Sequence, residues 1–188
     1  MPRLFTGVEI PTGIAERLAY LRGGLPGARW ISAENYHMTL RFMGDMDMVA
    51  AEAIAEALTR VRRMTFSLRI VGLGALGTRK PHAIVARVEP SQPLTELQAE
   101  HERLMQRIGL PPEGRKYTPH ITLARLRHAS SRDIADYLSL RGGFSTGPVE
   151  VDRFVLFSSR DSVGGGPYVV EEAYPLIPQN GAAARLSA

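Results

Sequence analysis

Two copies of one tetrapeptide contain the residue types that acid–base chemistry needs. Residues 37–40 (His-Met-Thr-Leu) and 120–123 (His-Ile-Thr-Leu) share the pattern His-x-Thr-Leu, one copy in each half of the chain. In an extended strand, residues i and i+2 face the same way, so each copy presents an imidazole beside a hydroxyl. The apolar residues would face the other side of the sheet, toward a core.

Two such strands would surround a common cleft with two imidazoles and two hydroxyls. This set suits the opening of a cyclic phosphodiester, in which a base deprotonates water and an acid protonates the leaving sugar oxygen. Histidine can do either, because its ordinary pKa is about 6.5. We therefore expect His37 and His120 to be the acid/base pair. The hydroxyls of Thr39 and Thr122 can bind the non-bridging oxygens, where charge concentrates in the transition state.

Simpler explanations exist for a single copy of the motif. A lone His-x-Thr in a strand is as well explained by a hydrogen-bonded structural histidine, but the duplication favours a functional pair. Zinc is the other option, although neither copy has the His-Glu-x-x-His or His-x-Glu spacing with partner ligands. The sequence therefore predicts catalysis without a metal. Among the other histidines, His101 lies along an apolar helical stripe and is expected to be structural, whereas His82 and His128 lack the threonine.

The elements that must position these residues alternate between strands and helices. Alternating hydrophobicity predicts strands at 3–10, 29–44 (one or two strands), 65–73, 82–88, 118–125, 149–158 and 168–176. Helical spacing predicts helices near 14–21, 47–61, 94–108 and 131–140. The turn-rich segment 72–81 and the run 164–167 are expected to be loops. We predict an α+β fold class in which one mixed unit is used twice, with residues 179–188 forming a disordered tail.

Composition excludes several other classes of site. The chain contains no cysteine, which rules out disulfides, thiolate zinc sites and a cysteine nucleophile. No stretch approaches the roughly 20 apolar residues that a membrane helix needs. The N-terminus lacks the pattern of a signal peptide, so we expect a cytoplasmic protein without membrane contact, and a monomer.

With these motifs identified, the sequence resembles the RNA 2′,3′-cyclic phosphodiesterases, also called 2′-5′ RNA ligase-like proteins, of the two-histidine phosphoesterase superfamily. The resemblance covers nearly the whole chain. Besides the paired His-x-Thr motifs, it includes the segments 3–5 (Arg-Leu-Phe), 30–44, 119–125 (Pro-His-Ile-Thr-Leu-Ala-Arg) and 156–160 (Leu-Phe-Ser-Ser-Arg).

This resemblance implies a fold and a reaction. Residues 1–178 would form a single domain with two pseudo-twofold-related lobes, each an antiparallel sheet packed with helices, and with the active-site cleft between them. His37 would donate a proton to the leaving 3′ oxygen of an RNA end or cyclic nucleotide, and His120 would activate water to give a 2′-phosphate. Because near-symmetric sites can exchange acid and base, the sequence leaves that order open. No cofactor is implied, and 2′-5′ joining of RNA ends would be the reverse reaction.

Two arginines are candidate substrate ligands. Strict alternation places Arg41 on the same face of its strand as His37 and Thr39, where it could reach a phosphate. The same rule places Arg125 on the face opposite His120. Arg125 would therefore act only if its strand twists or ends before it.

Other side chains could contact RNA more loosely. The pairs 79–80 (Arg-Lys) and 115–116 (Arg-Lys) precede strands in turn-rich segments and could line the mouth of a cleft. Solubility is the better explanation for such surface pairs, and the net charge of +4 is modest. Tyr36, Phe42, Tyr117 and Tyr168 are candidates for base stacking, although strand aromatics usually belong to the core.

Two other functions fit the same residues. The chemistry could act on a small cyclic-phosphate metabolite or a 2′-5′ oligonucleotide, which competition assays would distinguish. Alternatively, the chain could be a non-catalytic module that binds RNA ends, in which case it would bind tightly without turnover.

Overall fold

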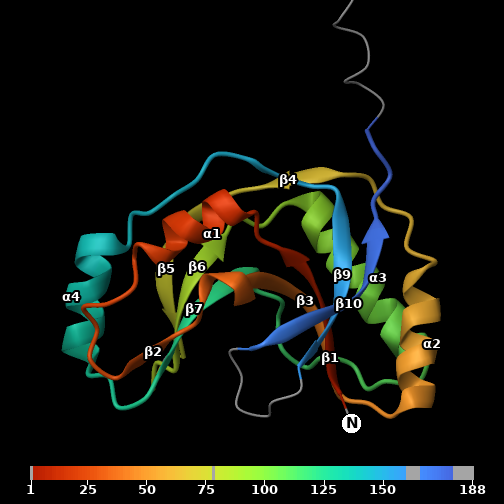
Figure 1. The fold of residues 1–188 in the computed structure, drawn as a ribbon, viewed down its shortest axis with the longest axis horizontal. Coiled ribbons are helices and arrows are strands. Elements are labelled where there is room, and N and C mark those ends of the chain that lie inside the picture. Colours follow the sequence, from red (N-terminus) through yellow and green to blue (C-terminus); the bar gives the residue numbers. More distant parts are fainter. Residues whose placement is uncertain (1, 78, 160–165, 180–188) are drawn as a thin grey trace, which may run out of the picture.

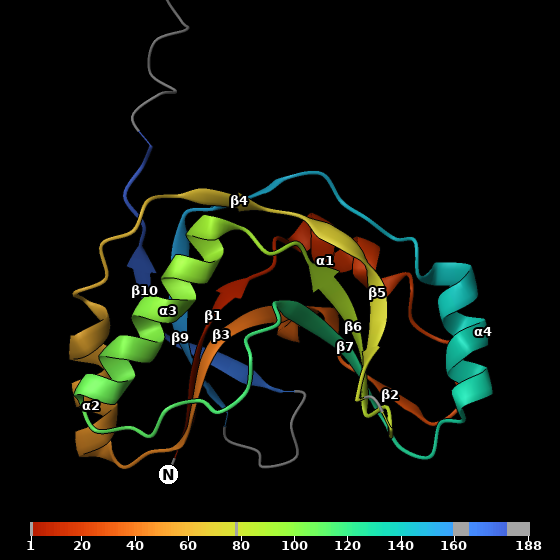
Figure 2. The ribbon, with the colours of Figure 1, turned by 180° about the vertical axis from the view of Figure 1, so that it is seen from behind.

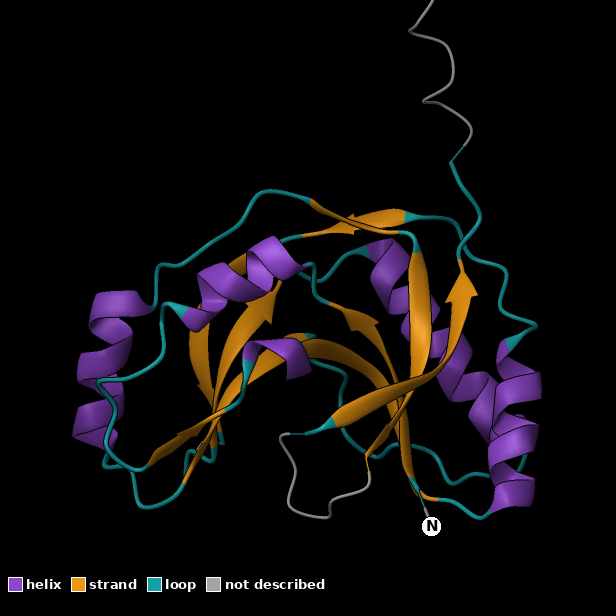
Figure 3. Cartoon of the chain, viewed as in Figure 1, coloured by secondary structure: helices purple, strands orange, loops and turns teal. Residues whose placement is uncertain are grey.

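The computed structural model describes residues 2–77, 79–159 and 166–179 of the chain. Its strands are β1 (Arg3–Glu9), β2 (Ala28–Trp30), β3 (His37–Asp45), β4 (Phe66–Leu68), β5 (Ile70–Leu76), β6 (Ala83–Val88), β7 (His120–Leu126), β8 (Val149–Val151), β9 (Arg153–Ser159) and β10 (Tyr168–Pro175). Its helices are α1 (Thr12–Ala19), α2 (Met48–Leu58), α3 (Gln92–Arg107) and α4 (Ser131–Arg141), with the short 3-10 helix η1 (Ala33–Asn35). The order of elements confirms the predicted α+β class (Figures 1 and 3).

The main sheet divides into two lobes that meet at its centre. Its strand order is β10-β9-β1-β3-β7-β6-β5, with β2 paired to β7, while β4 and β8 form a separate two-stranded sheet. The lobes join where β3 pairs with β7, at Met38 opposite Ile121. Figure 1 shows α2 and α3 beside the lobe of β1, β3, β9 and β10, and α4 beside the lobe of β5, β6 and β7. The predicted two-lobed arrangement is therefore confirmed.

The apolar residues of both motifs are buried at this junction. Met38, Leu40, Ile121 and Leu123 are each at most 2% exposed. They belong to one hydrophobic core that extends from α3 in one lobe to α4 in the other. Since this core is shared, the junction holds the two lobes in a fixed relation to one another.

Side-chain caps set the start of two helices. Oδ1 of Asp47 accepts a hydrogen bond from the backbone N–H of Ala50 at 2.8 Å, which fixes the start of α2. Ser130 caps α4 in the same way through the N–H of Asp133 at 3.1 Å. Both starts lie where the sequence predicts them. In the described part of the chain, no helix is long and apolar enough to cross a membrane.

The apolar stripe of α3 lies against the sheet, and His101 is fully buried within it. Figure 2, seen from behind, shows α3 lying across the lobe of β1, β3, β9 and β10, with α2 beside it. Nδ1 of His101 is 2.8 Å from Oγ1 of Thr6 on β1, and the ring packs edge-on against Phe154. Because burial disfavours the charged ring, the pKa of His101 is lowered to about 3. Its predicted structural role is confirmed.

The predicted loop at 72–81 is wrong in its first half. Gly72 and Gly74 lie inside β5, which continues to Leu76. A Cβ at Gly72 would lie 2.9 Å from the carbonyl oxygen of Gly142, and one at Gly74 would lie 3.3 Å from Nε of Arg87. These glycines therefore serve close packing on a strand rather than a turn.

Two further predictions concern residues that are only partly described. Of the expected turn at 164–167, residues 164 and 165 lie outside the described residues, and so do residues 180–188 of the expected tail. Gln179, at the start of that tail, donates its backbone N–H to Oγ1 of Thr65 at 3.3 Å and its side-chain amide to the Thr65 carbonyl at 2.8 Å.

Candidate active site

The two motifs begin adjacent antiparallel strands. His37 is the first residue of β3, and His120 is the first residue of β7. The strands pair at the residue between histidine and threonine in each motif, so the histidine of one strand lies on the side of the threonine of the other. All four predicted side chains are partly exposed and line one cleft. The structure therefore brings together His37, Thr39, His120 and Thr122.

This cleft has a volume of about 510 Å³ and is lined by both lobes. That size falls within the range of about 300–1,000 Å³ that is typical of small-ligand sites. Besides the motif residues, its lining includes Leu76, Gln98 and Tyr168. Within the described residues, no group of three or more histidine, aspartate or glutamate side chains is arranged to hold a metal ion.

Both imidazoles are oriented by backbone carbonyls. Nδ1 of His37 is 2.9 Å from the carbonyl oxygen of Asn35, and Nδ1 of His120 is 2.7 Å from that of Thr118. A carbonyl oxygen can only accept, so each Nδ1 carries the hydrogen and the neutral ring has its lone pair on Nε2. The two rings are thus held in the same tautomer. Sequence spacing did not reveal Asn35 or Thr118, because the acceptors are main-chain atoms.

Aromatic rings enclose His37. The ring centroids of Phe5 and Tyr168 each lie 4.8 Å from that of His37, and the centroid of Phe157 lies 5.4 Å away. This burial lowers the pKa of His37 to about 4, although the hydrogen bond to Asn35 opposes the shift. The imidazole is therefore neutral near pH 7.

The pKa of His120 is also lowered below its ordinary value. Burial is the main cause that lowers its pKa, and the positive charge of Arg125 and the neighbouring His82 add to the effect. The hydrogen bond to Thr118 acts in the opposite direction. An anion that enters between the two rings would raise both pKa values, because it favours the charged form of each imidazole.

A β-bulge in β3 changes the side of the sheet that Arg41 faces. Gly7 of β1 pairs with Thr39, but the next residue, Thr6, pairs with Arg41, which leaves Leu40 as an extra residue. Gly7 and Thr6 lie on opposite faces of β1. Thr39 and Arg41 must therefore also lie on opposite faces.

The second motif contains a bulge at the equivalent position. Val85 of β6 pairs with Thr122 and Ala83 pairs with Arg125, so Leu123 is the extra residue. Because Val85 and Ala83 share a face of β6, Thr122 and Arg125 share a face of β7. Arg125 accordingly lies on the same face of the sheet as His120 and Thr122.

The sequence therefore predicted the wrong face of the sheet for both Arg41 and Arg125. Arg125 lines the cleft. Arg41 still borders it, but its side chain is only 6% exposed and its guanidinium forms an ion pair with Glu102 of α3. In the first motif, the residue equivalent to Arg125 is Phe42, which lines the cleft and is 45% exposed.

Comparison with known proteins agrees with this duplicated architecture. A family model described as "LigT like Phosphoesterase" matches residues 8–86 and again residues 85–168, once for each half of the chain. The chain belongs to the LigT-like phosphoesterase family.

Curated relatives and solved structures of similar sequence support the assignment to the LigT-like family. Two relatives are named RNA 2′,3′-cyclic phosphodiesterase. The one from Aeropyrum pernix is 32% identical over 76% of this chain and 85% of the relative. The one from Aquifex aeolicus is 30% identical over 78% of this chain and 81% of the relative. The crystal structure of Escherichia coli LigT complexed with 3′-AMP is 25% identical, with a TM-score of 0.75 over 94% of this chain and 99% of that one.

One of the two basic pairs borders the cleft that the two motifs line, called here the LigT-like cleft. Arg115 and Lys116 line it, whereas Arg79 and Lys80 are not among its lining residues. His82 is also part of the lining, although the absence of a nearby threonine gave the sequence no reason to select it. His82 immediately precedes β6, next to the end of the strand where Ala83 pairs with Arg125, and it contributes to lowering the pKa of His120.

The four aromatic candidates divide between core and cleft. Tyr36 is buried, with 4% of its surface exposed. Tyr117 lines the cleft and donates its hydroxyl to the carbonyl oxygen of Thr39 at 3.1 Å. Phe42 and Tyr168 line the same cleft and are the aromatic residues best placed to meet a base.

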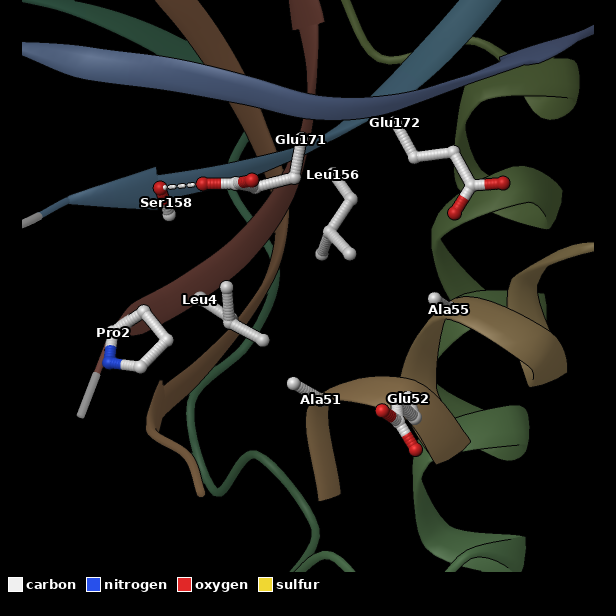
Figure 4. Close-up of a pocket in the computed structure, with 9 residues that line it drawn as sticks. All are labelled: Pro2, Leu4, Ala51, Glu52, Ala55, Leu156, Ser158, Glu171 and Glu172. Atoms are coloured by element: carbon white, nitrogen blue, oxygen red, sulfur yellow. Dashed lines mark hydrogen bonds between the residues drawn. The ribbon is translucent and has the colours of Figure 1, made fainter. Parts of the chain in front are cut away.

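A second hollow of about 620 Å³ lies away from both motifs. Figure 4 shows three glutamates around it, and Oγ of Ser158 donates a hydrogen bond to one of them, Glu171. Its lining among the described residues consists of Pro2, Leu4, Ala51, Glu52, Ala55, Leu156, Ser158, Glu171 and Glu172. These carboxylates would repel a phosphate, so the LigT-like cleft is the candidate active site.

Proposed function

We propose that this chain hydrolyses RNA 2′,3′-cyclic phosphate ends to 2′-phosphates by two-histidine acid/base catalysis. The observation that carries the proposal is the convergence of two imidazoles and two hydroxyls, from duplicated motifs, on one cleft. The relatives named RNA 2′,3′-cyclic phosphodiesterase support the substrate class. The 3′-AMP complex of LigT supports a nucleotide as the bound group.

His120 is the base and His37 is the acid in this mechanism. Nε2 of His120 accepts a proton from water as the water oxygen forms a bond to phosphorus. The bond from phosphorus to the 3′ oxygen breaks, and Nε2–H of His37 donates its proton to that oxygen. The product carries a 2′-phosphate and a free 3′ hydroxyl. The reverse reaction, with a sugar hydroxyl in place of water, joins RNA ends through a 2′-5′ linkage.

The proton on His37 is taken up when the substrate binds. The pKa of His37 is about 4, so the ring has to gain its proton as the phosphodiester anion arrives. The hydroxyls of Thr39 and Thr122 donate to the non-bridging oxygens, and Arg125 adds a positive charge on the same face. These groups stabilise the additional negative charge of the transition state without a metal ion.

Phe42 and Tyr168 provide apolar surface for the terminal base. Aromatic stacking of this kind tolerates all four bases, so we expect weak base preference. The two motifs lie on one chain, so a monomer contains the whole site. We expect it to act in the cytoplasm.

Substitution of each histidine by asparagine tests the proposal. His37→Asn and His120→Asn should each lower kcat on a cyclic-phosphate RNA end by about 100-fold or more, the range expected for loss of a general acid or base. His128→Asn is the matched control, because His128 is exposed, has a positive φ of 59° that asparagine tolerates, and does not line the cleft. Unchanged turnover in both motif variants would exclude the mechanism.

A further inference from the structure

Arg41 is held too firmly on its own side of the sheet to act as a substrate ligand. Its guanidinium forms an ion pair with Glu102 of α3, and it donates hydrogen bonds to the carbonyl oxygens of Phe42 and Pro111, the latter at 2.6 Å. A buried guanidinium is expensive to desolvate, so such a residue usually fixes the groups that satisfy it. One of those groups, Pro111, belongs to the segment that leads from α3 to β7.

That segment, residues 108–119, is called here the α3–β7 loop. It contains no helix or strand, yet it is tied down at several points. Besides the bond from Arg41 to Pro111, the N–H of Glu113 donates to Oε1 of Glu102 at 2.9 Å, and the hydroxyl of Tyr117 donates to the Thr39 carbonyl at 3.1 Å. Figure 2 follows this loop from the end of α3 past β3 to β7.

Glu102 is ionised and connects the two sides of this arrangement. Burial alone would raise the pKa of Glu102, but hydrogen bonds from Gln106 and from the N–H of Glu113, with the charge of Arg41, hold that pKa below its ordinary value. The carboxylate thus binds β3 through Arg41 and the α3–β7 loop through Glu113. The loop is ordered by these contacts although it lacks regular structure.

The ordered loop presents two positive side chains to the cleft. Arg115 and Lys116 both line it, together with His37 and His120. The side chain of Arg115 is 92% exposed, and its contact with Glu113, at 3.4 Å, is a surface ion pair of the kind that contributes little. Lys116 forms no hydrogen bond or ion pair with any residue in the described part of the chain. Both side chains are therefore available to a bound anion.

We propose that the α3–β7 loop is a subsite for the RNA strand upstream of the cyclic phosphate, and that the Arg41–Glu102 ion pair positions it. The inference rests on the proposed function, in which the motif residues bind the terminal phosphate and leave the next phosphates of the strand to other groups. Basic side chains on an ordered loop bind backbone phosphates without reading sequence. The ligand class is an oligoribonucleotide with at least one internal phosphodiester. Arg41 is thus a positioning residue.

The subsite predicts that the enzyme distinguishes substrates by length. A 2′,3′-cyclic mononucleotide has no upstream phosphate and cannot use the loop, whereas a tetranucleotide with the same terminal base can. The difference should lie in KM, because the subsite is remote from the reacting bonds. We expect the tetranucleotide to have a KM at least 10-fold lower than the mononucleotide, with a similar kcat.

The double variant Arg115→Ala, Lys116→Ala tests the subsite. It should raise KM for the tetranucleotide about 10-fold and raise KM for the mononucleotide by a clearly smaller factor, with little change in kcat for either substrate. The slope of log kcat/KM against log salt concentration should become shallower by about 0.7 for each phosphate of the single strand that the variant can no longer neutralise. The matched control is Arg79→Ala, Lys80→Ala, which removes an equal charge from residues that do not line the cleft. Equal effects of the two double variants would overturn the subsite.

The positioning role of Arg41 is tested by non-additivity. Arg41→Met should raise KM for the tetranucleotide as the loop double variant does. When Arg115→Ala and Lys116→Ala are added to Arg41→Met, this KM should rise by less than a further twofold. Full additivity of the two effects would show that Arg41 does not act through the loop. Glu102→Gln keeps the acceptor for Glu113 but removes the charge that pairs with Arg41. Glu102→Gln should give a KM for the tetranucleotide between those of the wild type and Arg41→Met. It serves as the second variant if Arg41→Met folds poorly.

Failure of the subsite can be distinguished from failure of the proposed function. If the wild-type protein hydrolyses the mononucleotide but shows no length preference, the function stands and the subsite is wrong. If it hydrolyses neither substrate, binding of a fluorescent tetranucleotide with a 2′-phosphate end replaces turnover as the measurement. Weaker binding by the Arg115→Ala, Lys116→Ala variant than by its control would then support the subsite, and equal binding would refute it.

Discussion

Met38 and Ile121 lie opposite each other where β3 pairs with β7, and each stands between the histidine and the threonine of its motif. Both side chains are fully buried in the shared core. The same pair of residues that joins the two lobes therefore sets the distance between the two halves of the candidate site. Packing at the junction and geometry in the cleft are coupled for this reason.

Met38→Ala should lower the free energy of unfolding by about 2–5 kcal/mol, because it leaves a cavity at the junction of the lobes. Urea unfolding monitored by circular dichroism would measure the loss. Met48→Ala provides the control, since Met48 begins α2 and is 76% exposed, and it should change the stability by less than about 0.5 kcal/mol. A loss for Met38→Ala as small as that of the control would argue against a tightly packed junction.

The bulges predict opposite outcomes for the two arginines. Arg125→Ala should lower kcat/KM on a 2′,3′-cyclic mononucleotide by about 100-fold or more, as expected for loss of a charged group that stabilises the transition state. Arg41→Met should lower it only a few-fold, because Arg41 faces α3. Steady-state kinetics with one mononucleotide compares the two directly. A larger defect for Arg41→Met would mean that strand alternation, not the bulge, describes the working site.

The pH profile of kcat/KM should have its limbs below the ordinary pKa of histidine. Burial lowers the pKa of His37 to about 4 and also lowers the pKa of His120, so both limbs of the bell-shaped profile should fall below pH 6.5. Above the upper limb, the free enzyme lacks the proton that the acid must donate, and kcat/KM falls. The limbs for kcat should lie at higher pH, since the bound anion raises both pKa values.

Arg125→Gln provides a check on this assignment. The charge of Arg125 contributes to lowering the pKa of both imidazoles, so its removal should move the limbs of the residual kcat/KM profile to higher pH. A wild-type upper limb above pH 7.5, or a shift to lower pH in Arg125→Gln, would contradict the account of the two histidines.

His101 should make the fold sensitive to acid. Its pKa is about 3 in the folded protein against about 6.5 in the unfolded chain, so the unfolded state binds the extra proton between these values. Stability is complete above pH 6.5 and falls as the pH drops toward 3. His101→Asn removes this titration and keeps an amide near Thr6. Between pH 6 and pH 5, the wild type should lose about 1 kcal/mol more than the variant, and equal losses would refute the effect.

The sequence predicted that the four motif residues share one face because the motif precedes the irregularity in each strand. His37 and Thr39 obey strict alternation, as do His120 and Thr122, and their shared face could therefore be inferred from spacing alone. The bulge follows one residue later in both strands, at Leu40 and at Leu123.

What the sequence did not reveal depends on contacts between distant residues. Hydrophobic pattern does not signal a single extra residue, so the faces of Arg41 and Arg125 were reversed. The order of the α3–β7 loop depends on Arg41 and Glu102, which meet only after β3 and α3 have packed. The glycines at 72 and 74 read as turn residues because their true partners, Gly142 and Arg87, lie on other elements.

The most direct test of the account is to identify the product that the purified protein makes, in excess chelator, from an RNA oligonucleotide ending in a 2′,3′-cyclic phosphate. The account predicts quantitative conversion to a 2′-phosphate end, at a rate that additional chelator does not change. An unchanged substrate, a 3′-phosphate product, or activity that returns only when a divalent metal is added would contradict it.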